Sequence, residues 1–162
     1  DLYNDRITGN GGANVLDGRG GADTLVGGGG NDTLDGGAIT DRNNYSDLNT
    51  VSYAASTAGV VVDLAAGTAQ DGLGGTDTLI DINWVRGGSG NDSLTGSSAN
   101  ALFEFFTGNA GDDTINGGAI TDTLNWRDGN RADYSGATSA INGNLATGIV
   151  SGGVDIGTYQ LS

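Results

Sequence analysis

Isolated aliphatic residues recur every nine positions along much of the chain, set between polar neighbours and glycine-rich stretches. This spacing predicts very short strands in which one aliphatic side chain points inward and the residues beside it point outward. Two nine-residue segments would complete one coil of 18 residues, and successive coils would stack. The aliphatic positions that define this register are Ile7, Leu16, Leu25, Leu34, Leu79, Leu94, Ile115 and Leu124.

The glycines and aspartates follow the same ninefold register. The segments GRGGADTLV at 18–26, GGGGNDTLD at 27–35 and GGSGNDSLT at 87–95 combine early glycines with aspartate at position six. Glycine permits left-handed and crowded backbone angles, so consecutive carbonyl groups can turn toward a common point. The aspartate adds an anionic oxygen, and calcium prefers six to eight oxygen ligands. The pattern therefore predicts calcium sites at the turns.

The candidate calcium ligands are the residues at position six of each segment. They are Asp5, Asn14, Asp23, Asp32, Asp41, Asp77, Asp92, Asp113 and Asp122. Residues one coil apart are expected to share an ion, as in the pairs Asp5 with Asp23, Asn14 with Asp32, and Asp23 with Asp41. We expect the Asn14 site to be weak, because its side chain carries no charge.

Later in the chain the spacing is irregular, yet the changes keep Asp77, Asp92 and Asp113 on one edge of the expected stack. Aspartates also occur side by side at Asp112 and Asp113, where we expect one side chain to point into the turn and the other into solvent. The whole chain is expected to bind about five or six calcium ions.

The repeat resembles the calcium-binding nonapeptide repeat of RTX (haemolysin-type) secreted proteins. The resemblance is close over residues 1–41 and 72–125. It implies an all-β fold, a right-handed parallel β-roll or β-solenoid with rows of calcium ions along both edges. It also implies an extracellular or cell-surface location, with export by type I secretion.

Composition indicates that such a chain needs a cation in order to fold. Hydrophobic residues make up 36%, 32 residues are glycine, and the formal net charge is -14. Low hydrophobicity with high net charge is typical of disordered chains. A disordered linker would not hold aspartate and leucine two positions apart through successive ninefold steps, and a phosphate-binding glycine loop needs a helix after it. Calcium is thus the expected cofactor.

Residue types also narrow the partners and the chemistry. All six basic residues are arginine, and nucleic acids or anionic membranes require clustered lysine or arginine. No apolar run approaches the length of a membrane span. The chain has no histidine, cysteine or lysine, which removes most nucleophile–base pairs and any disulfide framework. We therefore expect no enzymatic activity, no nucleic-acid partner and no membrane insertion.

A longer repeat lies over the short one. Residues 27–69 align with residues 108–150 at a constant offset of 81. We therefore expect a single β-roll over 1–162 made of two related units, about 1–80 and 81–162. Each unit would contain a run of nine-residue segments, a loop, and an alternating stretch of longer strands that widens the sheet.

Three features lie outside the repeat. The loops at 44–49 and 125–130 share the pattern N-aromatic-x-D-x-N, which favours side-chain-capped turns, with a further cation loop as the alternative. The segment ALFEFF at 101–106 holds all three phenylalanines and is expected to pack inside a broadened coil, or else to form an exposed contact strip. Trp84 is expected to cover the sheet face.

These observations predict a calcium-binding structural or spacer module of a secreted or cell-surface bacterial protein, of adhesin, surface-layer or matrix type. One alternative is a fibre subunit that joins end to end through residues near Leu2, Tyr3, Tyr159 and Leu161. Another is a non-catalytic C-terminal module of a secreted enzyme or toxin. The expected partners are calcium ions, with neighbouring repeats or further copies of the chain as possible contacts.

Overall fold

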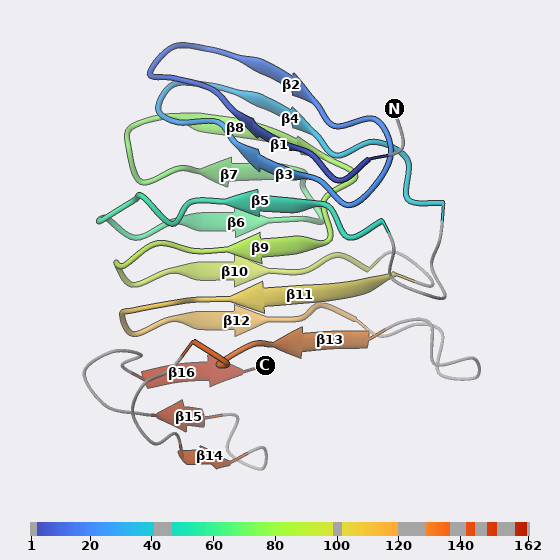
Figure 1. Cartoon of the computed structure of the whole chain (residues 1–162). Coiled ribbons are helices and arrows are strands. Elements are labelled where there is room, and N and C mark those ends of the chain that lie inside the picture. Colours follow the sequence, from blue (N-terminus) through green and yellow to red (C-terminus); the bar gives the residue numbers. More distant parts are fainter. Residues whose placement is uncertain are drawn as a thin grey trace.

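The computed structural model describes residues 3–40, 47–98, 102–119, 129–136, 142–144, 149–151 and 158–161. All regular secondary structure within these ranges is β, in sixteen strands that form two sheets. The strands are stacked one above another from the N-terminal coils to the C-terminal strands (Figure 1). The predicted all-β parallel β-roll is confirmed.

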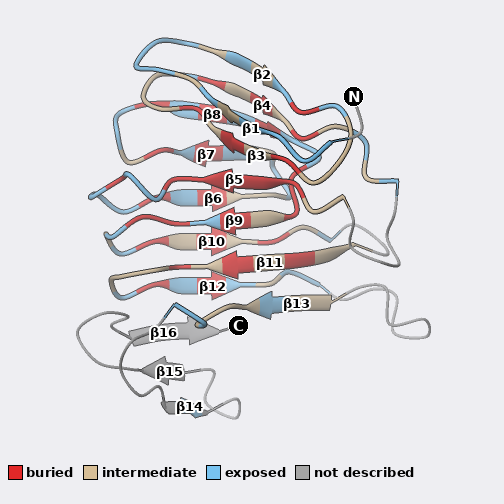
Figure 2. Ribbon diagram, viewed as in Figure 1, coloured by how far each residue is buried: buried red, intermediate tan, exposed pale blue. Residues whose placement is uncertain are grey.

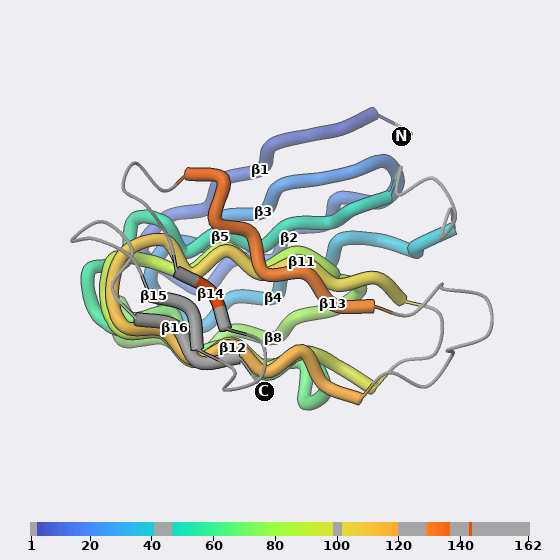
Figure 3. Tube along the Cα trace, turned by 90° about the horizontal axis from the view of Figure 1, so that it is seen from below, coloured from blue at the N-terminus to red at the C-terminus, as the bar shows by residue number. Residues whose placement is uncertain are grey.

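The first sheet has six strands, and all of them pair in parallel. Seen along the stacking direction, the strands of the two sheets lie on opposite sides of the coils (Figure 3). In spatial order the first sheet contains β1 (Arg6–Thr8), β3 (Thr24–Val26), β5 (Thr50–Ser52), β9 (Trp84–Arg86), β11 (Phe103–Thr107) and β13 (Gly129–Ala132).

The second sheet has ten strands and mixes parallel with antiparallel pairs. Its antiparallel parts are two three-stranded meanders, β6–β7–β8 and β14–β15–β16, set into an otherwise parallel sheet. In spatial order it contains β14 (Asn142–Asn144), β15 (Ile149–Ser151), β16 (Thr158–Leu161), β12 (Thr114–Asn116), β10 (Ser93–Thr95), β6 (Val61–Asp63), β7 (Thr68–Gln70), β8 (Thr76–Ile80), β4 (Thr33–Asp35) and β2 (Val15–Asp17).

The first four strands show the predicted coil in its regular form. The chain alternates between the sheets, so that β1 pairs with β3 and β2 pairs with β4. The paired residues include Ile7 with Leu25 and Leu16 with Leu34, which are 18 residues apart. Each strand has three residues because only the central one must reach the core.

A single file of apolar side chains between the sheets forms the core. Leu25, Leu34, Val51, Val85 and Leu94 are fully buried, and their strand neighbours are mostly more exposed. Figure 2 shows this alternation and the concentration of buried residues in the middle of the stack. Because each coil contributes only about two such side chains, the core is narrow and depends on exact stacking of the coils.

The aromatic segment divides between the core and the outer face of the first sheet. Phe106 is fully buried, as expected for a side chain packed inside a broadened coil. Phe105 instead stacks outward between Trp84 and Phe103, at ring-centroid distances of 5.4 Å and 5.0 Å. The guanidinium of Arg131 lies 5.7 Å from the Phe105 ring centre, a cation–π contact. Trp84 covers the sheet face, as predicted.

The segment 72–80 departs from the predicted nine-residue turn. Its strand β8 forms a hairpin with β7, and this hairpin is joined through β6 to the parallel strand β10. The glycines at 72 and 74 have φ values of +70° and +105° and serve the hairpin turn. The ninefold spacing of aspartate and leucine is therefore kept in β8, while the turn before it has a different shape.

Candidate calcium sites at the two edges

The candidate ligands lie at or near the starts of the strands. Because the strands of the two sheets run in opposite directions, the ligands form one row at each of two opposite edges of the stack (Figure 1). Strand pairing puts Asp5, Asp23, Asn49, Asn83, Glu104 and Asn130 in the row of the first sheet. In the second sheet it aligns Asn14 with Asp32 and Asp77, and it aligns Asp92 with Asp113. Both groups lie at the same edge, but the meander offsets them by two residues, because Asp77 is level with Val62 and Asp92 with Val60. Each row thus comes from the register of the strands that follow it.

One oxygen of each carboxylate is fixed by the neighbouring coil. The backbone N–H of Asp5 donates to Oδ1 of Asp23 at 2.8 Å, and that of Asn14 donates to Oδ1 of Asp32 at 2.8 Å. The same bond runs from Asp92 to Asp113 at 2.8 Å. These bonds hold one carboxylate oxygen rigidly and confirm the predicted stacking of Asp5 with Asp23 and of Asn14 with Asp32.

The second oxygen is buried and has no hydrogen-bond partner at Asp23 and at Asp32. A side-chain carbon at Gly27 would overlap Oδ2 of Asp32, and one at Gly18 would overlap Oδ2 of Asp23. Position-one glycine is thus required because the carboxylate lies directly over it. A buried carboxylate oxygen without a donor is costly unless a cation compensates it. These two sites therefore fit a calcium ion well.

Burial disfavours the charged form of several of these groups. Desolvation raises the pKa of Asp23, Asp77 and Asp92, and backbone hydrogen bonds to each carboxylate offset the rise only in part. A divalent cation next to a carboxylate acts in the opposite direction and favours ionisation. The electrostatics of the turns thus favour occupation by a positive ion.

No group of three or more acidic, histidine or cysteine side chains that could hold a metal ion occurs among the residues that the structure describes. Most ligands must therefore come from backbone carbonyl groups, with one or two carboxylates per ion. The backbone is shaped for this, because Gly28 and Gly30 have φ values of +102° and +103° within one turn. Such oxygen-rich, weakly acidic cages suit calcium, which accepts carbonyl ligands and irregular geometry.

In the first row, the residue that follows Asp23 in the stack is an asparagine, Asn49, and not an aspartate. The backbone N–H of Asp23 donates to Oδ1 of Asn49 at 3.1 Å, and Nδ2 of Asn49 donates to the carbonyls of Gly37 and Asp81. Asn49 is buried and has hydrogen-bond partners on both sides of its amide, so it stabilises this edge without an ion. Asp41, which was expected beneath Asp23, lies outside the described residues, as does Asp122.

Sequence reasoning also missed Glu104, the only glutamate of the chain. It is buried in the same row, and both of its carboxylate oxygens accept the backbone N–H of Ser97, at 3.0 Å and 3.1 Å. Its longer side chain spans a broadened coil, where an aspartate would fall short. Two features of the sequence could have identified these residues. Glu104 is the only glutamate of the chain, and Asn49 and Asn130 occupy the same position in the shared loop pattern.

The second row keeps its aspartates, but their spacing differs from the prediction. Asp77, Asp92 and Asp113 are buried at one edge, whereas Asp112 is exposed as predicted. Strands β6 and β7 separate Asp77 from Asp92, so these two do not stack directly. Oδ2 of Asp77 accepts the hydroxyl of buried Tyr53 at 3.0 Å, which partly satisfies it without a cation.

The two loop patterns at 44–49 and 125–130 lie largely outside the described residues. In the described part, Oδ2 of Asp47 accepts both the backbone N–H and the hydroxyl of Thr40, at 2.8 Å and 2.7 Å. These bonds connect the two ends of the first loop. The aromatic residues of both loops lie outside the described residues.

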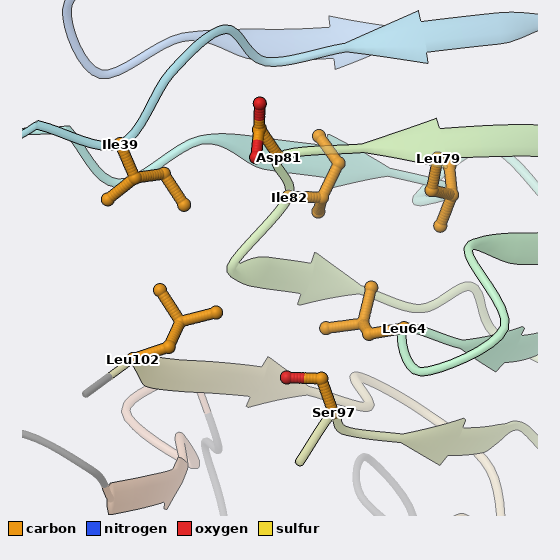
Figure 4. Close-up of a pocket in the computed structure, with 7 residues that line it drawn as sticks. All are labelled: Ile39, Leu64, Leu79, Asp81, Ile82, Ser97 and Leu102. Carbon is orange, nitrogen blue, oxygen red and sulfur yellow. The ribbon is translucent and has the colours of Figure 1, made fainter. Parts of the chain in front are cut away.

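A separate cavity of about 190 Å³ lies between the sheets, near the edge that carries the first row (Figure 4). Its lining is mostly aliphatic, and the carboxylate of Asp81 points away from the aliphatic side chains. The lining residues are Ile39, Leu64, Leu79, Asp81, Ile82, Ser97 and Leu102. This chemistry offers nothing to a cation.

The sequence matches the model of a known protein family. The family model described as RTX calcium-binding nonapeptide repeat (4 copies) matches residues 1–34, 80–100 and 101–130, more than half of the chain. It omits the region of β5–β8, where the structure departs from the regular coil. No curated protein matches. Within the described residues no helix is long and apolar enough to cross a membrane. The repeats of this family bind Ca²⁺, and the chain belongs to the RTX calcium-binding nonapeptide repeat family.

Proposed function

We propose that this protein is a calcium-dependent structural or spacer module of a secreted or cell-surface bacterial protein, and that it folds when it meets calcium outside the cell. Repeats of this family occur in proteins exported by type I secretion. The observation that carries the proposal is the buried, unpartnered Oδ2 of Asp23 and Asp32, each over a position-one glycine. These oxygens complete a cage only when a cation is bound.

The calcium ligands in this proposal are the position-six residues of the two rows. Two sites use Asp23, stacked with Asp5, and Asp32, stacked with Asn14; we expect the second to be the weaker, because Asn14 carries no charge. Asp92 with Asp113 forms a further site in the second row. The proposal also assigns Asp77, Asp41 and Asp122 as ligands on the basis of their position in the repeat.

Calcium concentration is the switch in this scheme. The chain carries a net charge of -14 over a narrow apolar core, so mutual repulsion opposes folding when calcium is scarce. When a site does not exist in the unfolded chain, the free energy of metal binding becomes free energy of folding. A low-calcium cytoplasm would keep the chain unfolded for export, and extracellular calcium would fold it.

Circular dichroism of the purified chain tests this proposal. In chelator we expect a coil-like spectrum, and at millimolar calcium we expect β-structure, with the transition absent in magnesium at the same concentration. Magnesium requires near-ideal octahedral geometry and sheds its waters reluctantly, so it is a matched control for charge. Equal structure in chelator and in calcium would refute the proposal.

The setting that we favour is an adhesin, surface-layer or matrix protein, in which a stacked coil sets the distance between other parts. The module would contribute no catalysis. A place beside the catalytic domain of a secreted enzyme or toxin is the rival setting, and there the roll would assist export and folding. Fusing the chain to a reporter domain distinguishes these two roles. A spacer would change only the distance between the neighbouring domains, whereas a module that assists export and folding would change the export and folding of the reporter.

End-to-end stacking is a second candidate function, favoured by the junction between the two related units. There β9 pairs with β5 and β10 pairs with β6, so a new coil continues both sheets through backbone hydrogen bonds. The same geometry would let equivalent units stack into a filament. Light scattering of the chain at high concentration in calcium tests this candidate, and a strictly monomeric particle would count against it.

A further inference from the structure

Asp71 lies outside the nonapeptide pattern, yet it is located at the same edge of the stack as the second row of aspartates. Strand β7 runs antiparallel to its neighbours, so its C-terminal end meets the edge where the parallel strands begin. The pairing of Val61 with Gln70 puts Asp71 beside Val60, whose backbone N–H donates to Oδ1 of Asp92 at 2.8 Å. Asp71 is therefore level with Val60 and Asp92 at this edge, on the strand between β6 and β8, and it lies opposite Gly75 across the hairpin.

The carboxylate of Asp71 has the same burial and the same pattern of hydrogen bonding as those of Asp23 and Asp32. It is fully buried, and its Oδ1 accepts the backbone N–H groups of Leu73 at 2.7 Å and Gly75 at 2.8 Å. Its Oδ2 is buried without a hydrogen-bond partner. One oxygen is thus fixed by the backbone and the other is left for a ligand, as in the position-six residues.

The backbone carbonyl of Gly30 lies close to Oδ2 of Asp71. A side-chain carbon at Gly75 would overlap the carbonyl oxygen of Gly30 and would lie 2.8 Å from Oδ2 of Asp71. Both oxygens therefore lie over the α-carbon of Gly75, on the side where any other residue would carry its side chain. Gly30 belongs to the turn that precedes Asp32, so this point connects the hairpin with the last regular coil.

The surroundings are acidic and hollow. After burial, the charges of Asp32 and Asp71 are among the causes that raise the pKa of Asp77. A hollow of about 390 Å³ adjoins Asp71, with a lining of glycines, Gln70 and Thr76. It is large enough for several waters, which calcium commonly keeps among its ligands. Negative charge, carbonyl oxygen and room for water are thus present together.

From this geometry we infer a calcium site at the β7–β8 hairpin, in which Oδ2 of Asp71 and the carbonyl of Gly30 are protein ligands. The site is additional to the nonapeptide turns and replaces the turn that segment 72–80 does not form. It continues the second row of ions across the antiparallel meander. Calcium is assigned because all available ligands are oxygen atoms and the geometry is irregular.

The Asp71→Asn variant tests the site, since asparagine keeps the Oδ1 acceptor for the hairpin turn but removes the charge. Native mass spectrometry at saturating calcium should show one calcium ion fewer per chain than in the unchanged protein. Asp81→Asn is the matched control, because Asp81 is exposed and its φ of +51° suits asparagine. This control should retain every ion.

An unchanged ion count in Asp71→Asn would overturn the inference while leaving the proposed function intact, whereas absence of calcium from all three proteins would refute the proposed function itself. A crystal structure of the unchanged protein grown in calcium gives a second test that does not depend on folding of the variant. We expect an ion 2.3–2.6 Å from Oδ2 of Asp71 and from the Gly30 carbonyl. A direct hydrogen bond between these two oxygens, with Asp71 protonated, would overturn the site.

Discussion

The regular coils β1–β4 and the meander β6–β8 share one stack but are held together differently. In the coils, each strand turns a single aliphatic side chain inward, and the two edges carry carboxylates, Asp23 and Asp32, with an unpartnered oxygen. In the meander, antiparallel pairing joins neighbouring strands directly. Its inward-facing apolar side chains, Val62, Ala69 and Leu79, are buried. Under the proposed function, the coils therefore depend on a bound cation, whereas the meander depends more on strand pairing and hydrophobic burial.

The second unit extends this contrast. Its strands β14–β16 repeat the order of β6–β8 at an offset close to 81 residues. At the positions equivalent to Asp71 and Asp77, however, the sequence has Gly152 and Thr158. A meander of this kind therefore forms with or without aspartates at its edge, which supports the view that its backbone pairing is not set by the cation.

Removal of calcium should give the largest difference in stability between the coils and the meander. As free calcium is lowered, hydrogen exchange of the Thr24 and Thr33 amides, which bond across the coils, should accelerate by orders of magnitude. The amide of Leu79, bonded within the meander to the carbonyl of Gly67, should lose protection at a lower calcium concentration. Residue-resolved exchange at a series of calcium concentrations measures this order. Simultaneous loss at all three amides would show that the regions form one cooperative unit.

A methyl group at position one should damage a coil severely. In Gly27→Ala the added carbon would overlap Oδ2 of Asp32, so we expect a loss of about 1–3 kcal/mol in stability together with weaker calcium binding. The matched variant Gly29→Ala meets only the side chain of Leu73, at 3.6 Å, and should change stability by less than about 0.5 kcal/mol. Chemical denaturation in saturating calcium compares them, and equal effects would contradict the site geometry.

The sequence predicted the coils well because their repeat directly encodes their physics. A buried leucine every nine residues and glycine before each aspartate are local requirements, so Leu25, Leu34 and Asp32 lie where the pattern puts them. The meander was harder to predict, since Asp77 and Leu79 keep the ninefold spacing while the turn before them is a hairpin. Antiparallel pairing of β7 depends on contacts with β6 and β8, which no short-range pattern reveals.

The candidate sites show the same limit. Asp23 and Asp32 were predictable from their position in the repeat, whereas Asn49 enters the first row because β5 pairs with β3 and so puts Asn49 beneath Asp23. Asp71 reaches the edge of the second row because its strand, β7, runs antiparallel to its neighbours. In both cases the residue type was visible in the sequence, but its place in the row followed from topology.

Loss of one position-six charge should weaken calcium binding without disrupting the coil. Asparagine at Asp32 keeps the Oδ1 acceptor for the Asn14 amide, so we expect Asp32→Asn to fold at a calcium concentration higher by roughly tenfold. Asp17→Asn is the control, because Asp17 is exposed and forms a surface ion pair with Arg19 at 3.4 Å. Calcium titrations followed by circular dichroism give both midpoints. Coinciding midpoints would remove Asp32 from the set of ligands.

The smallest expected effect concerns the point where the coils meet the meander. Tyr53→Phe removes the hydroxyl that donates to Oδ2 of Asp77 at 3.0 Å and leaves that buried oxygen without its donor. We expect a loss of about 1 kcal/mol, at the low end for a bond to a charged group, because calcium held near Asp77 can compensate the freed oxygen. The loss should therefore be greater at low calcium than at saturation, which denaturation at two calcium concentrations would measure. Tyr3→Phe provides the control, since Tyr3 is 75% exposed and should change stability little. An equal loss at both concentrations would show that Asp77 serves the meander as a hydrogen-bond acceptor and takes no part in the row of ions.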